Sequence, residues 1–170
     1  MRNSLLYLGI MMIGLLNLKC RDKYEEEILV GIIWDKNVYL EIKNAAGVDM
    51  LDPNSPNSFK RFKVYYLVNG IKEFYYDPWM DAPGGYIIQK FPNESFYQLQ
   101  IFINGPTHES RNDHEWVTYL EFEDGSTDTI SASFGVRPGN ISVEKATYNG
   151  RPMWDTSLTY AKEPFELIKP

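Results

Sequence analysis

The chain has 170 residues, enough for one domain of ordinary size, and 44% of them are hydrophobic and 15% aromatic. This composition argues against disorder for the bulk of the chain, because there is enough apolar surface to offset the loss of chain entropy. The formal net charge is −6, and the sequence has no cluster of Lys and Arg. We therefore expect no nucleic-acid partner, since phosphates are neutralised by dense cations.

The first 19 residues have the pattern of a secretion signal. Arg2 precedes an uncharged run over residues 5–16, whose helical length of about 18 Å is short of the roughly 30 Å hydrocarbon core. Cys20, the only cysteine of the chain, follows four residues after this run. Its position resembles that in bacterial lipoprotein signals, where a peptidase cuts before a cysteine that receives acyl chains such as palmitate.

This resemblance implies a signal peptide over residues 1–19 and a membrane anchor on Cys20. The chain would then be an outer-membrane lipoprotein of the cell envelope. Residues 20–27 form a charged linker, and its "RDKYEEE" looks like the acidic stretch of surface-exported lipoproteins. Without residues 1–19, 15 Lys and Arg stand against 23 Asp and Glu, a net charge of −8. The alternatives are an ordinary cleaved signal with a chance cysteine, and an uncleaved anchor.

Residues 28–170 show the two-residue period of β-strands and are expected to form a single domain. After "ILVGIIW" and "NVYLEIK", residues 44–60 hold two prolines and predict an irregular connection. In "FKVYYLVNGIKEFYYD", Asn69-Gly70 predicts a two-residue hairpin turn that pairs Val68 with Ile71, Tyr66 with Glu73 and Val64 with Tyr75. We expect the face that carries these six side chains to be the buried one.

The rest of the chain continues the strand pattern, and none of it has the stripe of an amphipathic helix. "GGYIIQKF" and "SFYQLQIFIN" predict strands, and "EWVTYLEFEDGSTDTISASF" and "NISVEKATYNGRPMW" predict hairpins around Gly125 and around Asn149-Gly150. The tail after Trp154 either supplies one more edge strand or stays mobile. The sequence therefore predicts an all-β fold, an immunoglobulin-like antiparallel β-sandwich of about 7–10 short strands.

Four segments in this order look like a family of small surface lipoproteins of Gram-negative gut anaerobes: "GVDMLDPNSPNSF", "YYLVNG", "TYLEFEDGSTDTI" and "YNGRPMWD". The resemblance runs over most of residues 20–155. It implies a β-sandwich and a cell-envelope location, and it carries no catalytic residues, because the family has no established activity.

Both histidines of the chain lie in "THESRNDHEW". His108 and His114, with acidic neighbours, offer metal-ligand types, but a polar loop between strands explains them equally. Asp124, Ser126 and Asp128 resemble the opening of a calcium loop and also fit a plain hairpin turn. We expect no metal, no cofactor and no catalytic residue.

The loop "YYDPWMDAPGGY" places large apolar side chains among turn-forming residues. Trp79 and Tyr86 are therefore the candidate ligand-binding residues, because exposed rings on a rigid β-fold stack on sugar faces or apolar side chains. The alternative is that Trp79 folds back and closes one end of the sandwich.

These observations predict a non-catalytic binding or accessory protein, anchored to the membrane by lipid, whose partner is a glycan or a cell-envelope protein. One alternative is a metal-assisted hydrolase that uses the His108/His114 loop. Another is a structural subunit of a surface assembly joined by strand addition.

Overall fold

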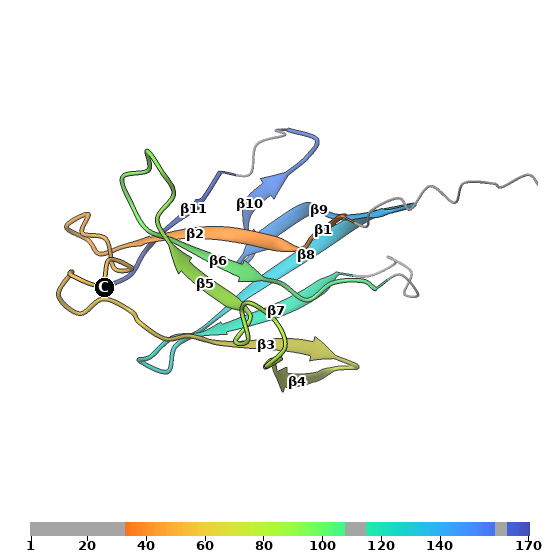
Figure 1. Cartoon of the computed structure of the whole chain (residues 1–170), viewed down its shortest axis with the longest axis horizontal. Helices are drawn as coiled ribbons and strands as arrows, with labels where there is room; N and C mark the ends of the chain where they lie inside the picture. The colour runs from red at the N-terminus through yellow and green to blue at the C-terminus, as the bar shows by residue number, and fades with distance from the viewer. Residues whose placement is uncertain (1–32, 108–114, 159–162) are drawn as a thin grey trace, which may run out of the picture. The chain divides into compact units, whose positions relative to one another are not determined.

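The computed structural model describes residues 33–107, 115–158 and 163–170, and this part of the chain is all-β (Figure 1). In chain order its strands are β1 (Ile33–Asp35), β2 (Asn37–Lys43), β3 (Lys63–Val68), β4 (Ile71–Phe74), β5 (Tyr86–Gln89), β6 (Gln98–Phe102), β7 (Trp116–Glu121), β8 (Thr127–Arg137), β9 (Asn140–Tyr148), β10 (Arg151–Asp155) and β11 (Phe165–Ile168). The described residues contain no helix, and so none that could span a membrane.

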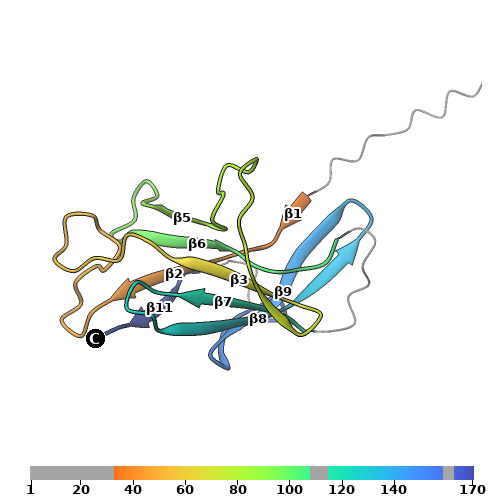
Figure 2. The same cartoon turned by 90° about the horizontal axis from the view of Figure 1, so that it is seen from below.

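The strands form two sheets (Figures 1 and 2). The larger has the order β1-β9-β8-β7-β3-β4, with β10 paired to β9 beyond the stretch that β1 occupies. The smaller has the order β11-β2-β6-β5. Both are mixed, because β1 pairs with β9 and β11 pairs with β2 in parallel.

The two sheets enclose one hydrophobic core, an arrangement consistent with a β-sandwich. Alternate side chains of β2, and Leu99 and Ile101 of β6, point inward from the smaller sheet, and alternate side chains of β7, β8 and β9 point inward from the larger one. The largest fully buried members are Tyr148, Phe134, Leu40, Ile42, Leu51, Leu99, Ile101, Leu120, Ile130 and Ile141. Burial of such side chains stabilises the fold by roughly 1.5–3 kcal/mol each.

The three predicted hairpins are present. Asn69 and Gly70 have positive φ of 52° and 80°, and the pairs Val68–Ile71 and Tyr66–Glu73 have the predicted register. Gly125 has a φ of +82° in the turn between β7 and β8. Asn149-Gly150 joins β9 to β10 with φ of 48° and 76°. Local turn chemistry thus sets the register of six of the eleven described strands, β3 with β4, β7 with β8 and β9 with β10.

The face of the first hairpin that was expected to be buried is buried only in part. Val64 is fully buried and Tyr66 packs against the core, but Ile71 is 63% exposed. The reason is that β4 is the last strand of its sheet and pairs with β3 alone.

The predicted antiparallel arrangement is wrong for two edge strands, β1 and β11. Both run parallel to their neighbours, β9 and β2. The hydrophobic period specifies which face of a strand is buried but not its direction, and neither strand is tied to its neighbour by a short turn.

The connection over residues 44–60 is irregular, as predicted, apart from an isolated bridge between Lys43 and Asp49. It still contributes to the core, because Met50 and Leu51 are buried. Asp49 holds it to the smaller sheet by accepting the backbone N–H of Tyr97 at 2.7 Å.

Candidate functional site

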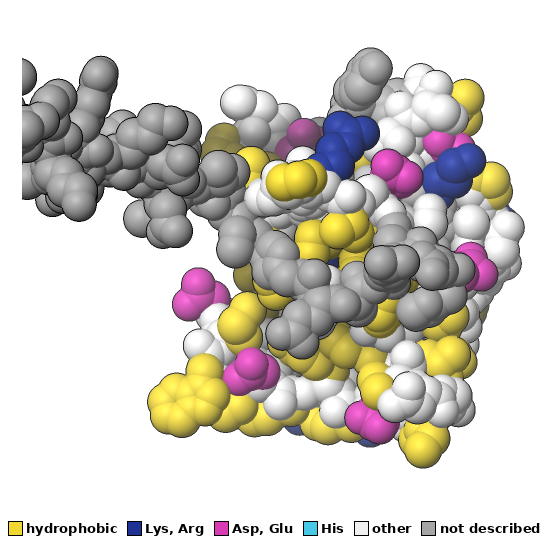
Figure 3. Space-filling model, turned by 90° about the vertical axis from the view of Figure 1, so that its right-hand side faces the viewer, with side chains coloured by type: hydrophobic (Ala, Val, Ile, Leu, Met, Phe, Trp, Pro, Cys, Tyr) yellow, Lys and Arg dark blue, Asp and Glu magenta, His cyan; other side chains and the backbone are white. Residues whose placement is uncertain are grey.

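The described residues form a hollow of about 630 Å³ beside the loop that follows β4. Four stretches line it: β1 with the residue that follows it, β3, the loop after β4, and the end of β6 with the segment that leaves it. The lining residues that matter chemically are Trp34, Lys36, Tyr66, Tyr75, Asp77, Trp79, Met80, Asp81 and Asn104. Figure 3 shows hydrophobic side chains gathered on a face of the domain, with acidic side chains among them.

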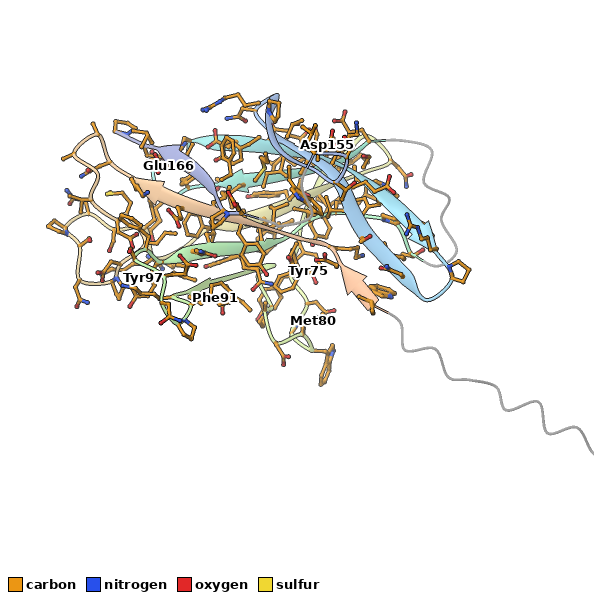
Figure 4. The ribbon with its side chains drawn as sticks, turned by 90° about the horizontal axis from the view of Figure 1, so that it is seen from above. Tyr75, Met80, Phe91, Tyr97, Asp155 and Glu166 are labelled. Atoms are coloured by element: carbon orange, nitrogen blue, oxygen red, sulfur yellow. The ribbon has the colours of Figure 1, made fainter. Side chains whose placement is uncertain are left out.

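The loop that follows β4 is shaped by backbone hydrogen bonds. Asp77 donates its N–H to the Pro83 carbonyl at 2.9 Å, and its Oδ1 accepts the N–H of Trp79 at 3.0 Å. These bonds fix the main chain that carries the indole, although the Trp79 side chain is 93% exposed. Trp79 therefore does not fold back onto the sandwich. Figure 4 shows Met80 of this loop and Tyr75 at its start on the same side of the domain.

Two tyrosines form the wall behind the loop. The rings of Tyr66 and Tyr75 lie 4.6 Å apart, and the hydroxyl of Tyr66 donates to the Phe102 carbonyl at 2.9 Å. A Cβ at Gly85, whose φ is +77°, would approach the Tyr75 ring to 2.8 Å. Burial raises the pKa of both tyrosines, so both hydroxyls are neutral donors at physiological pH.

Polar side chains stand among these rings. Nζ of Lys36 lies 4.7 Å from the centre of the Trp34 ring and donates to the Pro106 carbonyl at 3.4 Å. Burial lowers the pKa of Lys36. Asn104 is buried, where its backbone N–H donates to Oγ1 of Thr118 at 2.8 Å and its Nδ2 to the Leu67 carbonyl at 3.0 Å. The hollow thus combines flat apolar surfaces with charged and amide groups.

The structure does not bring the two candidate residues Trp79 and Tyr86 into one hollow. The Tyr86 ring packs against Phe62 at 5.4 Å, and its hydroxyl accepts the backbone N–H of Phe62 at 3.2 Å. Tyr86 instead lines a second, shallower hollow beside the charged side chains of Lys63 and Glu121.

Sequence reasoning missed most of the residues around Trp79. Trp34 and Lys36 lie more than 40 residues before it in the chain, and Asn104 lies 25 residues after it. No local motif joins these positions. Only the strand order places them together. The one feature of the sequence that pointed to an aromatic site was the excess of aromatic residues, because no spacing of residues did so.

The two ion-binding hypotheses concern different parts of the chain, and the structure describes only the one that was proposed for calcium. His108 and His114 lie outside the described residues. Within those residues, no group of three or more His, Cys, Asp or Glu could hold a metal ion. Asp128 is committed to Tyr148, Asn149 and Lys169, whereas Asp124 accepts the N–H of Ser126 within its own turn. The calcium-like spacing thus lies in the turn between β7 and β8 and at the start of β8, where both carboxylates have protein partners.

Comparisons with protein-family models, with curated proteins and with solved structures find no match to this chain.

Proposed function

We propose that the chain is a lipid-anchored protein of the cell envelope, at the outer membrane, that binds a glycan without catalysing a reaction. The observation that carries this proposal is the exposed indole of Trp79, held by a hydrogen-bonded loop at the rim of an aromatic hollow. An exposed ring on a fixed main chain loses little freedom when a ligand stacks on it.

The chemistry of the hollow favours a saccharide over a protein partner. Aromatic faces stack on the C–H faces of sugar rings, while carboxylate and amide groups bond to hydroxyls. The volume of about 630 Å³ lies within the roughly 300–1,000 Å³ range of small-ligand sites. Protein interfaces of standard size instead bury about 800 Å² per partner over a broader surface.

Calorimetry of the full-length chain in mild detergent against a panel of neutral and acidic oligosaccharides tests this function. We expect at least one saccharide to bind with a Kd below about 1 mM, which corresponds to about −4 kcal/mol. If none of the panel binds, a glycan is not the partner.

The anchor has its own prediction. Cys20→Ala should abolish acyl labelling and release the protein from the membrane fraction, because each buried CH₂ of an acyl chain contributes about 0.8 kcal/mol to membrane binding. Metabolic labelling with palmitate and fractionation of cells measure both effects. Lys19→Ala, which keeps the thiol, serves as the control and should still be labelled. Equal labelling of the Cys20→Ala variant would refute lipidation.

The immunoglobulin-like type of sandwich also belongs to this proposal. It is supported by the path of the chain, which passes from one sheet to the other between β2 and β3, β4 and β5, and β6 and β7. Such crossings are typical of Greek-key sandwiches, whose loops gather at the two ends and often form the binding surface. The hollow is lined in part by two of these connections, the ones that follow β4 and β6.

The charges on the edge strand β4 argue against strand addition between two copies at this edge. Its side chains are all exposed, and Lys72 and Glu73 occupy its centre. In the two symmetric antiparallel registers with the greatest overlap, Lys72 faces Lys72 or Glu73 faces Glu73 of the second copy. Like charges directly opposite each other destabilise a strand pair, and charged edges prevent association.

A further inference from the structure

We infer that the ligand of the hollow is an acidic saccharide, one whose sugar residue carries a carboxylate, and that Lys36 binds this carboxylate. The inference rests on the proposed glycan-binding function and adds the class of sugar and the residue that selects it.

The first observation is that Lys36 is a half-buried cation without a counter-ion in the described part of the chain. No Asp or Glu of that part forms an ion pair with it, whereas Lys43, Lys63, Lys145 and Lys169 each have one. Within the described residues, the Lys36 ammonium contacts the face of Trp34 and the Pro106 carbonyl. Burial of a charge among such groups is unfavourable until an opposite charge joins it, which a ligand carboxylate would do.

The second observation is that the backbone leaves room for this lysine. A Cβ at Gly105 would lie 3.0 Å from Cδ of Lys36 and 2.7 Å from the Phe134 ring. Any larger residue at position 105 would therefore push the lysine stem away from its place. Gly105 and Lys36 both line the hollow, so the lysine stem packs against this glycine at the edge of the ligand space.

The third observation is the charge on the loop. Asp77 and Asp81 line the same hollow from the segment after β4, whereas Lys36 comes from the segment between β1 and β2. Carboxylates accept hydrogen bonds from sugar hydroxyls and repel another carboxylate. The three charges therefore orient a sugar acid, with its carboxylate at Lys36 and its hydroxyls toward the loop. A phosphate, which carries nearly two charges, is repelled more strongly by the same loop.

The test compares matched sugars on the full-length chain in mild detergent. Trigalacturonic acid is paired with the neutral galactotriose of the same linkage, and a glucuronic acid oligosaccharide with its glucose counterpart. In one of the two pairs, calorimetry should show that the acidic sugar binds about 10-fold more tightly than its neutral partner. This ratio is typical of the gain from one hydrogen bond to a charged group. Lys36→Met keeps the apolar stem and should lower the acidic affinity about 10-fold, with little change for the neutral sugar.

Lys72→Met is the matched control, because Nζ of Lys72 lies over the rings of Tyr65 and Tyr119, outside the hollow. It should leave both affinities unchanged. A salt titration of the unmodified protein needs no variant, and raising salt should weaken binding of the acidic sugar alone.

Three results overturn the inference while the glycan-binding function stands: equal affinity for the acidic and neutral sugars in both pairs, an equal loss of both in Lys36→Met, and salt-independent binding of the acidic sugar. Absence of binding by all four sugars overturns the inference and counts against the function as well.

Discussion

Replacement of Trp79 with alanine is expected to weaken saccharide binding by about 10-fold or more and to leave the stability of the domain almost unchanged. The loss of affinity follows from the stacking contribution of an aromatic ring, about 0.5–1.5 kcal/mol beyond the area that it buries. Stability should not change, because the side chain is 93% exposed and its removal creates no cavity. Calorimetry and thermal unfolding of the full-length chain measure the two quantities.

Tyr76→Ala is the matched control for this prediction. Tyr76 belongs to the same loop and is 61% exposed, but it does not line the hollow. Truncation of this ring should change neither affinity nor stability. If both variants lose affinity equally, the effect comes from the loop as a whole and the stacking role of Trp79 is wrong.

The second large effect is expected at Asp128, on strand β8. Its carboxylate accepts the Tyr148 hydroxyl at 2.5 Å and Nδ2 of Asn149 at 2.7 Å, and it pairs with Nζ of Lys169 at 2.7 Å. The group ties the residue after β11 to strands of the other sheet. Asp128→Ala should lower the free energy of unfolding by about 3 kcal/mol, because it leaves a largely buried ammonium and hydroxyl without their partner. Chemical denaturation measures this difference.

Glu123→Ala is the control for a surface carboxylate. Its contact with Nε of Arg61 is 3.5 Å long and exposed, so the expected loss is within about 0.5 kcal/mol. A similar small loss in Asp128→Ala would show that the network does not hold the C-terminal strand.

The same network predicts sensitivity to acid. Burial alone raises the pKa of Asp128, but the bonds from Lys169, Tyr148 and Asn149 outweigh it and hold the pKa below its usual value. The group therefore stabilises the fold above the pKa of an unfolded aspartate, about 3.9, and this contribution is lost as the pH falls through the lower folded value. As the pH falls below about 4, the free energy of unfolding should decrease more steeply for the unmodified protein than for Asp128→Ala.

Local chemistry explains which parts of the fold the sequence predicted. The register of the Asn69-Gly70 hairpin depends on two residues that accept positive φ, and both lie beside the strands that they join. The inward faces of β2 and β6 follow from the alternation of hydrophobic residues such as Leu40 and Leu99. Neither prediction needed knowledge of the other sheet.

The direction of the edge strands and the composition of the hollow required information that no local segment holds. β11 pairs with β2 although most of the chain separates the two strands in sequence. Nothing in "FELI" specifies a parallel partner. Trp79 was found because its own loop is unusual, whereas Trp34 and Lys36 join it only through the placement of β1 beside β9. Tyr86 was paired with Trp79 by proximity in sequence, but its ring at the start of β5 packs onto Phe62.

The most direct test of the central claim uses the four tryptophans of the chain as reporters. Trp34 and Trp79 line the hollow, whereas Trp116 and Trp154 are partly buried and pack against the core. In an NMR titration of the indole N–H signals with the saccharide of highest affinity, the signals of Trp34 and Trp79 should shift in proportion to occupancy, and those of Trp116 and Trp154 should stay in place. Shifts confined to Trp116 or Trp154, or no indole shift at saturation, would contradict the assignment of this hollow as the binding site.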